Sequence, residues 1–135
     1  MNIRANALSA GVWAAPQIGL DDVPELERLG IRRIVSHRPD SEEPGQPSAA
    51  EMSAAATAAG MEFVHAPVSG MPGADAVKAT AGALEDGSPV LMFCRSGTRS
   101  TFAWALAMRS LDRADAETLR TTAAAAGYDL SRLPL

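Results

Sequence analysis

The only cysteine of the chain, Cys94, lies where an apolar run ends and a small polar loop with two arginines begins, in the stretch VLMFCRSGTRS. Gly97 allows the backbone to turn tightly, so that several N–H groups of the loop can point inward and bind an anion. The helix that we expect to begin near Thr98 adds its positive dipole end, and Arg99 adds a planar charged fork suited to an oxyanion. Since these groups favour a thiolate, we expect Cys94 to be a catalytic nucleophile and Arg99 to act with it.

The remaining residues of the loop are expected to bind the anion. They are Arg95, Ser96, Gly97, Thr98 and Ser100. An outward-pointing Arg95 with no role is an open alternative, and one of the hydroxyls could cap the helix instead of donating to the thiolate or the substrate. The alternative for Cys94 itself is a small buried residue that only ends a core strand. The glycine, arginines and hydroxyl residues that follow it favour the catalytic interpretation.

The composition is that of one globular domain, which we place over residues 1–135, with a motif-bearing core at 2–111 and a C-terminal helix at about 115–126. The net charge of −4 and the pI of about 5.1 give no general attraction for nucleic acid or an anionic membrane. One cysteine and two histidines show no metal-ligand spacing, so we expect no metal and no other cofactor. The N-terminus is a poor signal peptide and no segment is long enough to span a bilayer, which predicts a cytoplasmic protein.

Short β-like runs alternate with helical segments along the chain. Strands are predicted near 12–13, 31–37, 61–68 and 89–94, and helices near 21–30, 48–60, 74–85, 98–111 and 115–126. Ser48 and Glu51 form a capping box that opens the second of these helices. The alternation predicts a three-layer α/β fold with a short, mostly parallel sheet flanked by helices. In such sheets ligands bind at the carboxyl ends of the strands, which is where Cys94 is expected.

Two motifs resemble those of a known family. The loop from Cys94 to Ser100 resembles the anion-binding loop of cysteine-dependent phosphatases and rhodanese sulfurtransferases. With HRPDSEEPGQPS at 37–48 before it, and Phe93 in place of a tyrosine, the chain resembles the phosphatase-like domain attached to beta-lactamase-hydrolase-like proteins. The resemblance runs from about Asn2 to Leu111. It implies a cysteine-dependent phosphatase-like fold similar to that of dual-specificity phosphatases.

The chain departs from the phosphatase pattern that this resemblance implies. Such enzymes usually place an arginine six residues after the cysteine, a histidine before it, and an aspartate on a separate loop as the acid. Here Arg99 is five residues after Cys94, Phe93 stands at the histidine position, and VSGMPGADA has no aspartate before Asp75. We expect Asp75 to cap the helix that follows. The shorter loop resembles the rhodanese arrangement, and sulfite leaves thiosulfate without needing an acid, so these departures favour sulfur transfer.

The loop after the second predicted strand of the parallel sheet could supply further site residues. Arg38 could add positive charge, and Asp40, like Asp75, could act as an acid; alternatively, Arg38 to Asp40 form only a turn. Glu42 and Glu43 are expected to be solvated. His65 is interpreted as a satisfied core histidine, and His37 is a weak candidate near the predicted ligand side.

The leading hypothesis is a cysteine-dependent sulfurtransferase. Cys94 would take sulfane sulfur from thiosulfate or a persulfide and pass it to a thiol acceptor. Because relatives of this domain are fused to sulfur-oxidising domains, the resemblance also implies a separate sulfide-oxidising enzyme as a partner. The first alternative is a protein-tyrosine or dual-specificity-like phosphatase that hydrolyses a phosphate ester through a Cys94 phosphoenzyme. The second is a non-enzymatic sensor of persulfides or anions.

Overall fold

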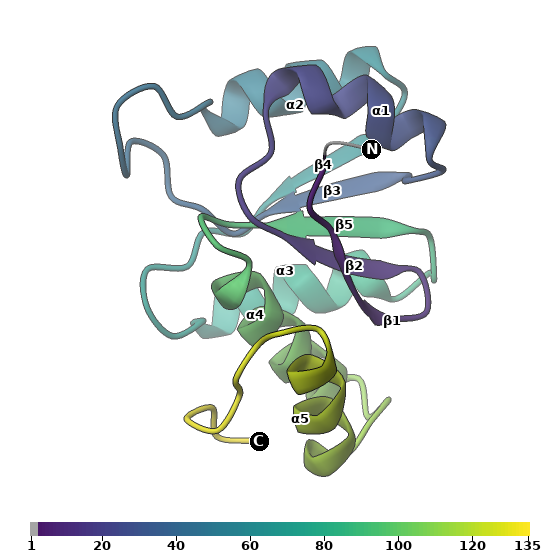
Figure 1. The fold of residues 1–135 in the computed structure, drawn as a ribbon, viewed down its shortest axis with the longest axis vertical. Helices are drawn as coiled ribbons and strands as arrows, with labels where there is room; N and C mark the ends of the chain where they lie inside the picture. The colour runs from purple at the N-terminus through teal and green to yellow at the C-terminus, as the bar shows by residue number, and fades with distance from the viewer. Residues whose placement is uncertain (1–2) are drawn as a thin grey trace.

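The computed structural model describes residues 3–135, and a five-stranded sheet forms its centre (Figure 1). The strand order is β1–β2–β5–β3–β4. The edge strand β1 (Asn6–Ser9) pairs antiparallel with β2 (Val12–Ala15), whereas β5 (Val90–Phe93), β3 (Arg33–Ser36) and β4 (Glu62–His65) continue the sheet in parallel. The prediction of a short, mostly parallel sheet is therefore confirmed.

Helices cover both faces of this sheet, as Figure 1 shows, with α1 and α2 on one side and α3, α4 and α5 on the other. The helices are α1 (Val23–Arg28), which follows the 3₁₀ turn η1 (Leu20–Asp22), α2 (Ala49–Ala58), α3 (Ala74–Leu84), α4 (Thr98–Ser110) and α5 (Ala116–Ala125). The three-layer α/β fold that the sequence predicts is thus present. None of these helices, within residues 3–135, combines the length and the apolar character needed to cross a bilayer.

The strand β5 is apolar throughout because both of its faces are buried. Leu91 and Phe93 belong to the core under α1 and α2, and Val90 and Met92 belong to the core under α3 and α4. All four side chains are 1% exposed or less. A continuous apolar run, rather than an alternating one, is what a central parallel strand requires.

The register of the sheet determines what lies beside Cys94. Ser36 of β3 and Ala15 of β2 both align with Phe93, the last residue of β5. Beyond the strands, the His37 N–H donates to the Phe93 carbonyl at 2.8 Å and the Cys94 N–H to the Ala15 carbonyl at 3.4 Å. Because the parallel strands end at one edge of the sheet, the loops that follow β2, β3, β4 and β5 meet around Cys94.

Candidate active site around Cys94

Cys94 is fully buried at the base of the loop that leads from β5 into α4. Gly97, the N-cap of α4, has a φ of +96°, a left-handed conformation that suits glycine. The turn directs the Gly97 N–H to the Cys94 sulfur, at an N···S distance of 3.1 Å. The sulfur therefore faces two groups of positive polarity, this N–H and the N-terminus of α4.

Arg99, in the first turn of α4, is held by two acceptors from other loops. Its Nη1 donates to Glu42 Oε2 at 2.7 Å and to the Val68 carbonyl at 2.7 Å, and its Nη2 donates to Glu42 Oε1 at 2.9 Å. The hydrogen bonds to Glu42 are the main cause of a raised pKa of Arg99, and the charge of nearby Cys94 raises this pKa further. The guanidinium is therefore fixed close to the sulfur.

Glu42 joins this arginine to a second one, so the prediction that it is a solvated loop residue is wrong. Its Oε1 also accepts from Arg38 Nε at 2.9 Å, and only 28% of its side chain is exposed. The hydrogen bond from Arg99, followed by that from Arg38, lowers the pKa of Glu42 to about 2. At neutral pH it is a carboxylate that positions Arg99 and has no proton to give.

Arg38 lies behind Glu42 and is 2% exposed. It donates to Gln17 Oε1 at 3.0 Å and, through Nη2, to Glu43 Oε1 at 2.8 Å. Glu43 is about half exposed and is paired rather than purely solvated. The Arg38 carbonyl is 2.9 Å from His65 Nε2, so His65 is satisfied, as expected. Arg38 thus acts on the site through Glu42.

The two aspartates considered as acids are engaged elsewhere or exposed. Asp40 Oδ1 accepts from the Ala49 N–H at 2.8 Å, at the start of α2. Asp75 is exposed on the second residue of α3, and Gly73 is the N-cap of that helix. The prediction that Asp75 caps α3 is wrong because the helix begins one residue before it. Within residues 3–135, no hydrogen bond or ion pair joins either aspartate to Cys94 or Arg99.

A buried histidine holds one of the loop hydroxyls. The Thr80 hydroxyl donates to the Ala76 carbonyl at 2.7 Å, so it accepts from His37 Nε2 at 2.8 Å. The Nδ1 of His37 can then accept a hydrogen bond from Ser100 Oγ, also at 2.8 Å. Burial lowers the pKa of His37 to about 3, which keeps the ring neutral. Ser100 therefore donates to His37, and the expectation that it donates to the thiolate or substrate is not met.

The other loop side chains lie on the surface. Ser96 Oγ is 3.1 Å from Thr98 Oγ1 and 3.4 Å from the Thr98 N–H, and these contacts stabilise the turn. Arg95 is exposed, and its carbonyl accepts from the Gln17 N–H at 3.2 Å. Within the described residues, none of these side chains makes a hydrogen bond to the Cys94 sulfur, which accepts from the Gly97 N–H.

Two residues that the sequence analysis did not single out close one side of the loop. Tyr128, from the segment after α5, packs on Gly97: a Cβ at Gly97 would overlap the Tyr128 hydroxyl and lie 2.9 Å from its Cζ. Asn6 Nδ2 of β1 donates to the Tyr128 hydroxyl at 3.0 Å. The residues are 122 positions apart in the chain, and no local pattern connects them.

A family profile described as the phosphatase-like domain of beta-lactamase hydrolase-like proteins matches residues 4–111. The chain belongs to this family. The match agrees with the resemblance seen in the sequence, whose expected start at Asn2 lies outside the described residues. A beta-lactamase hydrolase-like protein of Agrobacterium fabrum is 36% identical over 100 residues, which are 73% of this chain and 23% of that protein. The phosphatase-like domain spans about a quarter of the length of the curated relatives it matches.

Solved structures place the domain among cysteine-dependent phosphatase folds. A candidate phosphatase of Neisseria meningitidis superposes with a TM-score of 0.77 and 30% identity, covering 94% of this chain and 91% of the other. TpbA of P. aeruginosa, crystallised with phosphotyrosine, superposes with a TM-score of 0.62 and 20% identity, covering 89% and 71% of the two chains. These comparisons favour the phosphatase alternative over the sulfurtransferase hypothesis.

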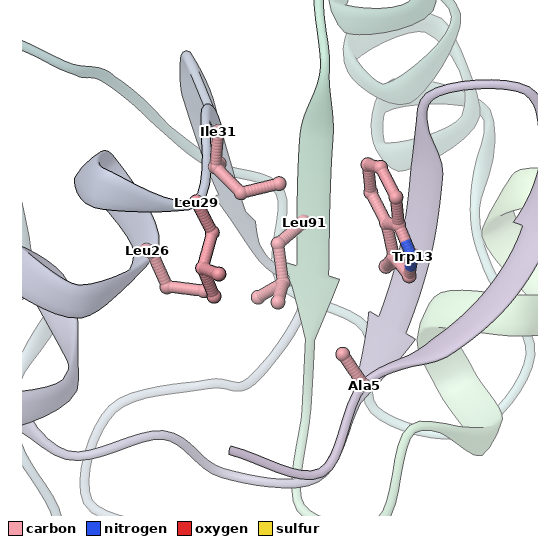
Figure 2. A pocket seen from close by; sticks show the side chains of 6 residues that line it. All are labelled: Ala5, Trp13, Leu26, Leu29, Ile31 and Leu91. Atoms are coloured by element: carbon pink, nitrogen blue, oxygen red, sulfur yellow. The ribbon is translucent and has the colours of Figure 1, made fainter. Parts of the chain in front are cut away.

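The phosphatase-like domain also has an apolar pocket that shares no residue with the Cys94 loop. It has a volume of about 190 Å³ and is lined by Ala5, Trp13, Leu26, Leu29, Ile31 and Leu91 (Figure 2). It offers no group for catalysis. Among residues 3–135, no set of three or more His, Cys, Asp or Glu side chains is arranged to hold a metal ion.

Proposed function

We propose that this domain is a cysteine-dependent phosphatase that hydrolyses aryl phosphate monoesters through a phosphocysteine on Cys94. The observation that carries the proposal is the pairing of the Gly97 N–H with the Cys94 sulfur at 3.1 Å in a loop whose Arg99 is fixed beside it. Membership of a phosphatase-like family, and a neighbour at 30% identity described as a candidate phosphatase, support the same conclusion.

The reaction has two steps. The Cys94 thiolate attacks phosphorus, the bond from phosphorus to the leaving oxygen breaks, and its electron pair stays on that oxygen. Water then attacks the phosphocysteine, releasing inorganic phosphate and restoring the thiolate. The loop amides and Arg99 stabilise the charge that spreads over the phosphoryl oxygens in each step.

The state of the nearby carboxylates determines which leaving groups are suitable. Glu42 is ionised, with its pKa at about 2, and Asp40 is bound to the start of α2. The first step therefore proceeds without a protonated acid from these residues. A phenoxide tolerates this because the pKa of a tyrosine hydroxyl is only about 10. An alkoxide is a much stronger base, so we expect phosphotyrosine-like esters to react and phosphoserine-like esters to react poorly.

The test is a kinetic comparison of 4-nitrophenyl phosphate, phosphotyrosine and phosphoserine, with Cys94→Ser and Arg99→Ala as variants. We expect turnover of the two aryl esters, none with Cys94→Ser, and a kcat about 10²-fold lower with Arg99→Ala, as for the loss of an oxyanion donor. Intact-mass spectrometry after rapid acid quenching should detect one phosphoryl group on the wild type only. Absence of turnover and of this adduct with every ester would refute the proposal.

Sulfur transfer is the second candidate, because the loop from Cys94 to Arg99 is short and its chemistry requires no acid. In that case, the thiolate would attack the outer sulfur of thiosulfate and release sulfite, leaving a Cys94 persulfide that a thiol then reduces. Intact-mass spectrometry after incubation with thiosulfate or glutathione persulfide separates the two: a gain of one sulfur, lost on adding glutathione and absent in Cys94→Ser, supports transfer.

A further inference from the structure

A hollow of about 690 Å³, lined by both polar and apolar residues, lies against the Cys94 loop. Its lining includes Arg95 and Ser96 of the loop, Arg4 and Asn6 of the N-terminal segment, and Tyr128, which packs on Gly97. The hollow and the site at Cys94 therefore share the same short piece of backbone.

The two arginines of the hollow are exposed. Within residues 3–135, neither the Arg4 nor the Arg95 side chain makes a hydrogen bond or an ion pair, whereas Arg38 and Arg99 are both held by carboxylates. Glu43 is close enough to Arg95 for that charge to contribute to its lowered pKa, but its hydrogen bond from Arg38 is the larger cause. Two guanidinium groups are thus available to an incoming anion.

The Tyr128 hydroxyl adds a donor on the same side. Since Asn6 Nδ2 donates to it, its own proton remains free, and it donates to no other residue in the described part of the chain. Two fork-shaped cations and an O–H group are donors that suit a carboxylate or a phosphate.

We propose that this hollow binds a second anionic group of the substrate, so that the preferred phosphate esters carry a further carboxylate or phosphate on the leaving group. The inference rests on the proposed phosphatase function and specifies its substrate class. Arg4 is the specificity-determining residue, because it lies in the N-terminal segment and outside the catalytic loop. The second anion adds binding at both the ground and the transition state, and therefore acts mainly on KM.

The experiment compares two phosphotyrosine peptides that differ only in having glutamate or glutamine on both sides of the phosphotyrosine. We expect kcat/KM to be about 5-fold higher for the glutamate peptide at low salt, from partly exposed ion pairs, and the ratio to fall with added salt. Arg4→Gln should bring the ratio close to 1 and leave hydrolysis of the glutamine peptide unchanged. The matched control is Arg32→Gln, because Arg32 is exposed at the opposite end of the sheet.

Fluorescence anisotropy measures how tightly each peptide binds to the Cys94→Ser protein. This measurement separates failure of the second-anion inference from failure of the proposed function. If both peptides are hydrolysed equally by the wild type, the second-anion site is refuted while the phosphatase function stands. If neither is hydrolysed, the function fails, and tighter binding of the glutamate peptide that is lost with Arg4→Gln still supports the site. Equal binding of the two peptides, or an equal effect of Arg32→Gln, overturns it.

Discussion

Replacing Gly97 by alanine would place a methyl group where the backbone and Tyr128 both oppose it. The φ of +96° disfavours any residue with a Cβ, at a cost of about 1–2 kcal/mol. The new Cβ would also overlap the Tyr128 hydroxyl and lie 2.9 Å from Cζ and 3.1 Å from Cε1. Since the ring must move, its hydrogen bond from Asn6 is lost, at about 0.5–1.5 kcal/mol.

We therefore expect Gly97→Ala to lower the free energy of unfolding by about 1.5–3.5 kcal/mol. The effect on catalysis should be larger than stability alone explains, because the Gly97 N–H is the donor to the Cys94 sulfur. Alanine keeps this N–H, but the turn that directs it to the sulfur must change, and loss of one preorganised donor lowers kcat by about 10²-fold. Urea unfolding and the turnover of 4-nitrophenyl phosphate measure the two effects separately.

Tyr128→Ala, alone and combined with Gly97→Ala, tests the reasoning. Removing the ring removes the overlap but leaves the unfavourable φ, so the double variant should be more stable than the sum of the single costs predicts, by about 1 kcal/mol. Gly82→Ala is the control: a Cβ there would have no atom within 4 Å, and alanine should stabilise the interior of α3 by about 0.5–1 kcal/mol. A wild-type-like Gly97→Ala, or strict additivity with Tyr128→Ala, would refute the argument.

Three further outcomes are expected. Burial holds the pKa of His37 at about 3, below its unfolded value of about 6.5. The contribution of His37 to stability is therefore full above pH 6.5 and falls as the pH drops toward 3, by at most about 1.4 kcal/mol per pH unit. Urea melts of His37→Asn at several pH values should lack this slope. The lowered pKa of Glu42 gives stability that is full above about pH 4.5 and is lost toward pH 2. Glu42→Gln should show a smaller loss in the same melts, because Asp86 and the other carboxylates with a lowered pKa still contribute. Arg38→Met should lower the free energy of unfolding by about 1–2 kcal/mol in urea and raise KM, because Glu42 then loses one of the two arginines that hold it. An unchanged KM would contradict the role of Arg38 in positioning Glu42.

The sequence was most informative where one residue type must serve one local geometry. The apolar run 90–93 had to be a central strand because both of its faces are buried, and Gly97 had to form the turn after it. Ser48 and Glu51 cap α2 reciprocally, at 3.1 Å and 2.9 Å, as their spacing predicts. Each of these features depends on a few consecutive residues, so the chain alone reveals them.

The contacts that complete the site join segments far apart in the chain, and the sequence did not reveal them. Glu42 and Arg99 are 57 positions apart, and the loop that carries Glu42 has no periodic pattern from which a pairing could be inferred. The identification of Asp75 as a cap failed for a local reason, because Gly73 can take the N-cap position without a side chain. The only signal in the sequence that could have indicated Glu42 is that Arg99 needs an acidic partner and that Glu42 is an acidic residue in a loop expected near the site.

One contact links the position of Arg99 to the choice of substrate. The hydrogen bonds that fix Arg99 come from a carboxylate, and the same bonds keep that carboxylate ionised. Glu42 can therefore hold Arg99 only by being unable to protonate a leaving group. We therefore expect the site to suit leaving groups that depart as stable anions, and phenoxide and sulfite both meet this condition. The comparison of aryl and alkyl phosphates is for this reason also a test of the role of Glu42.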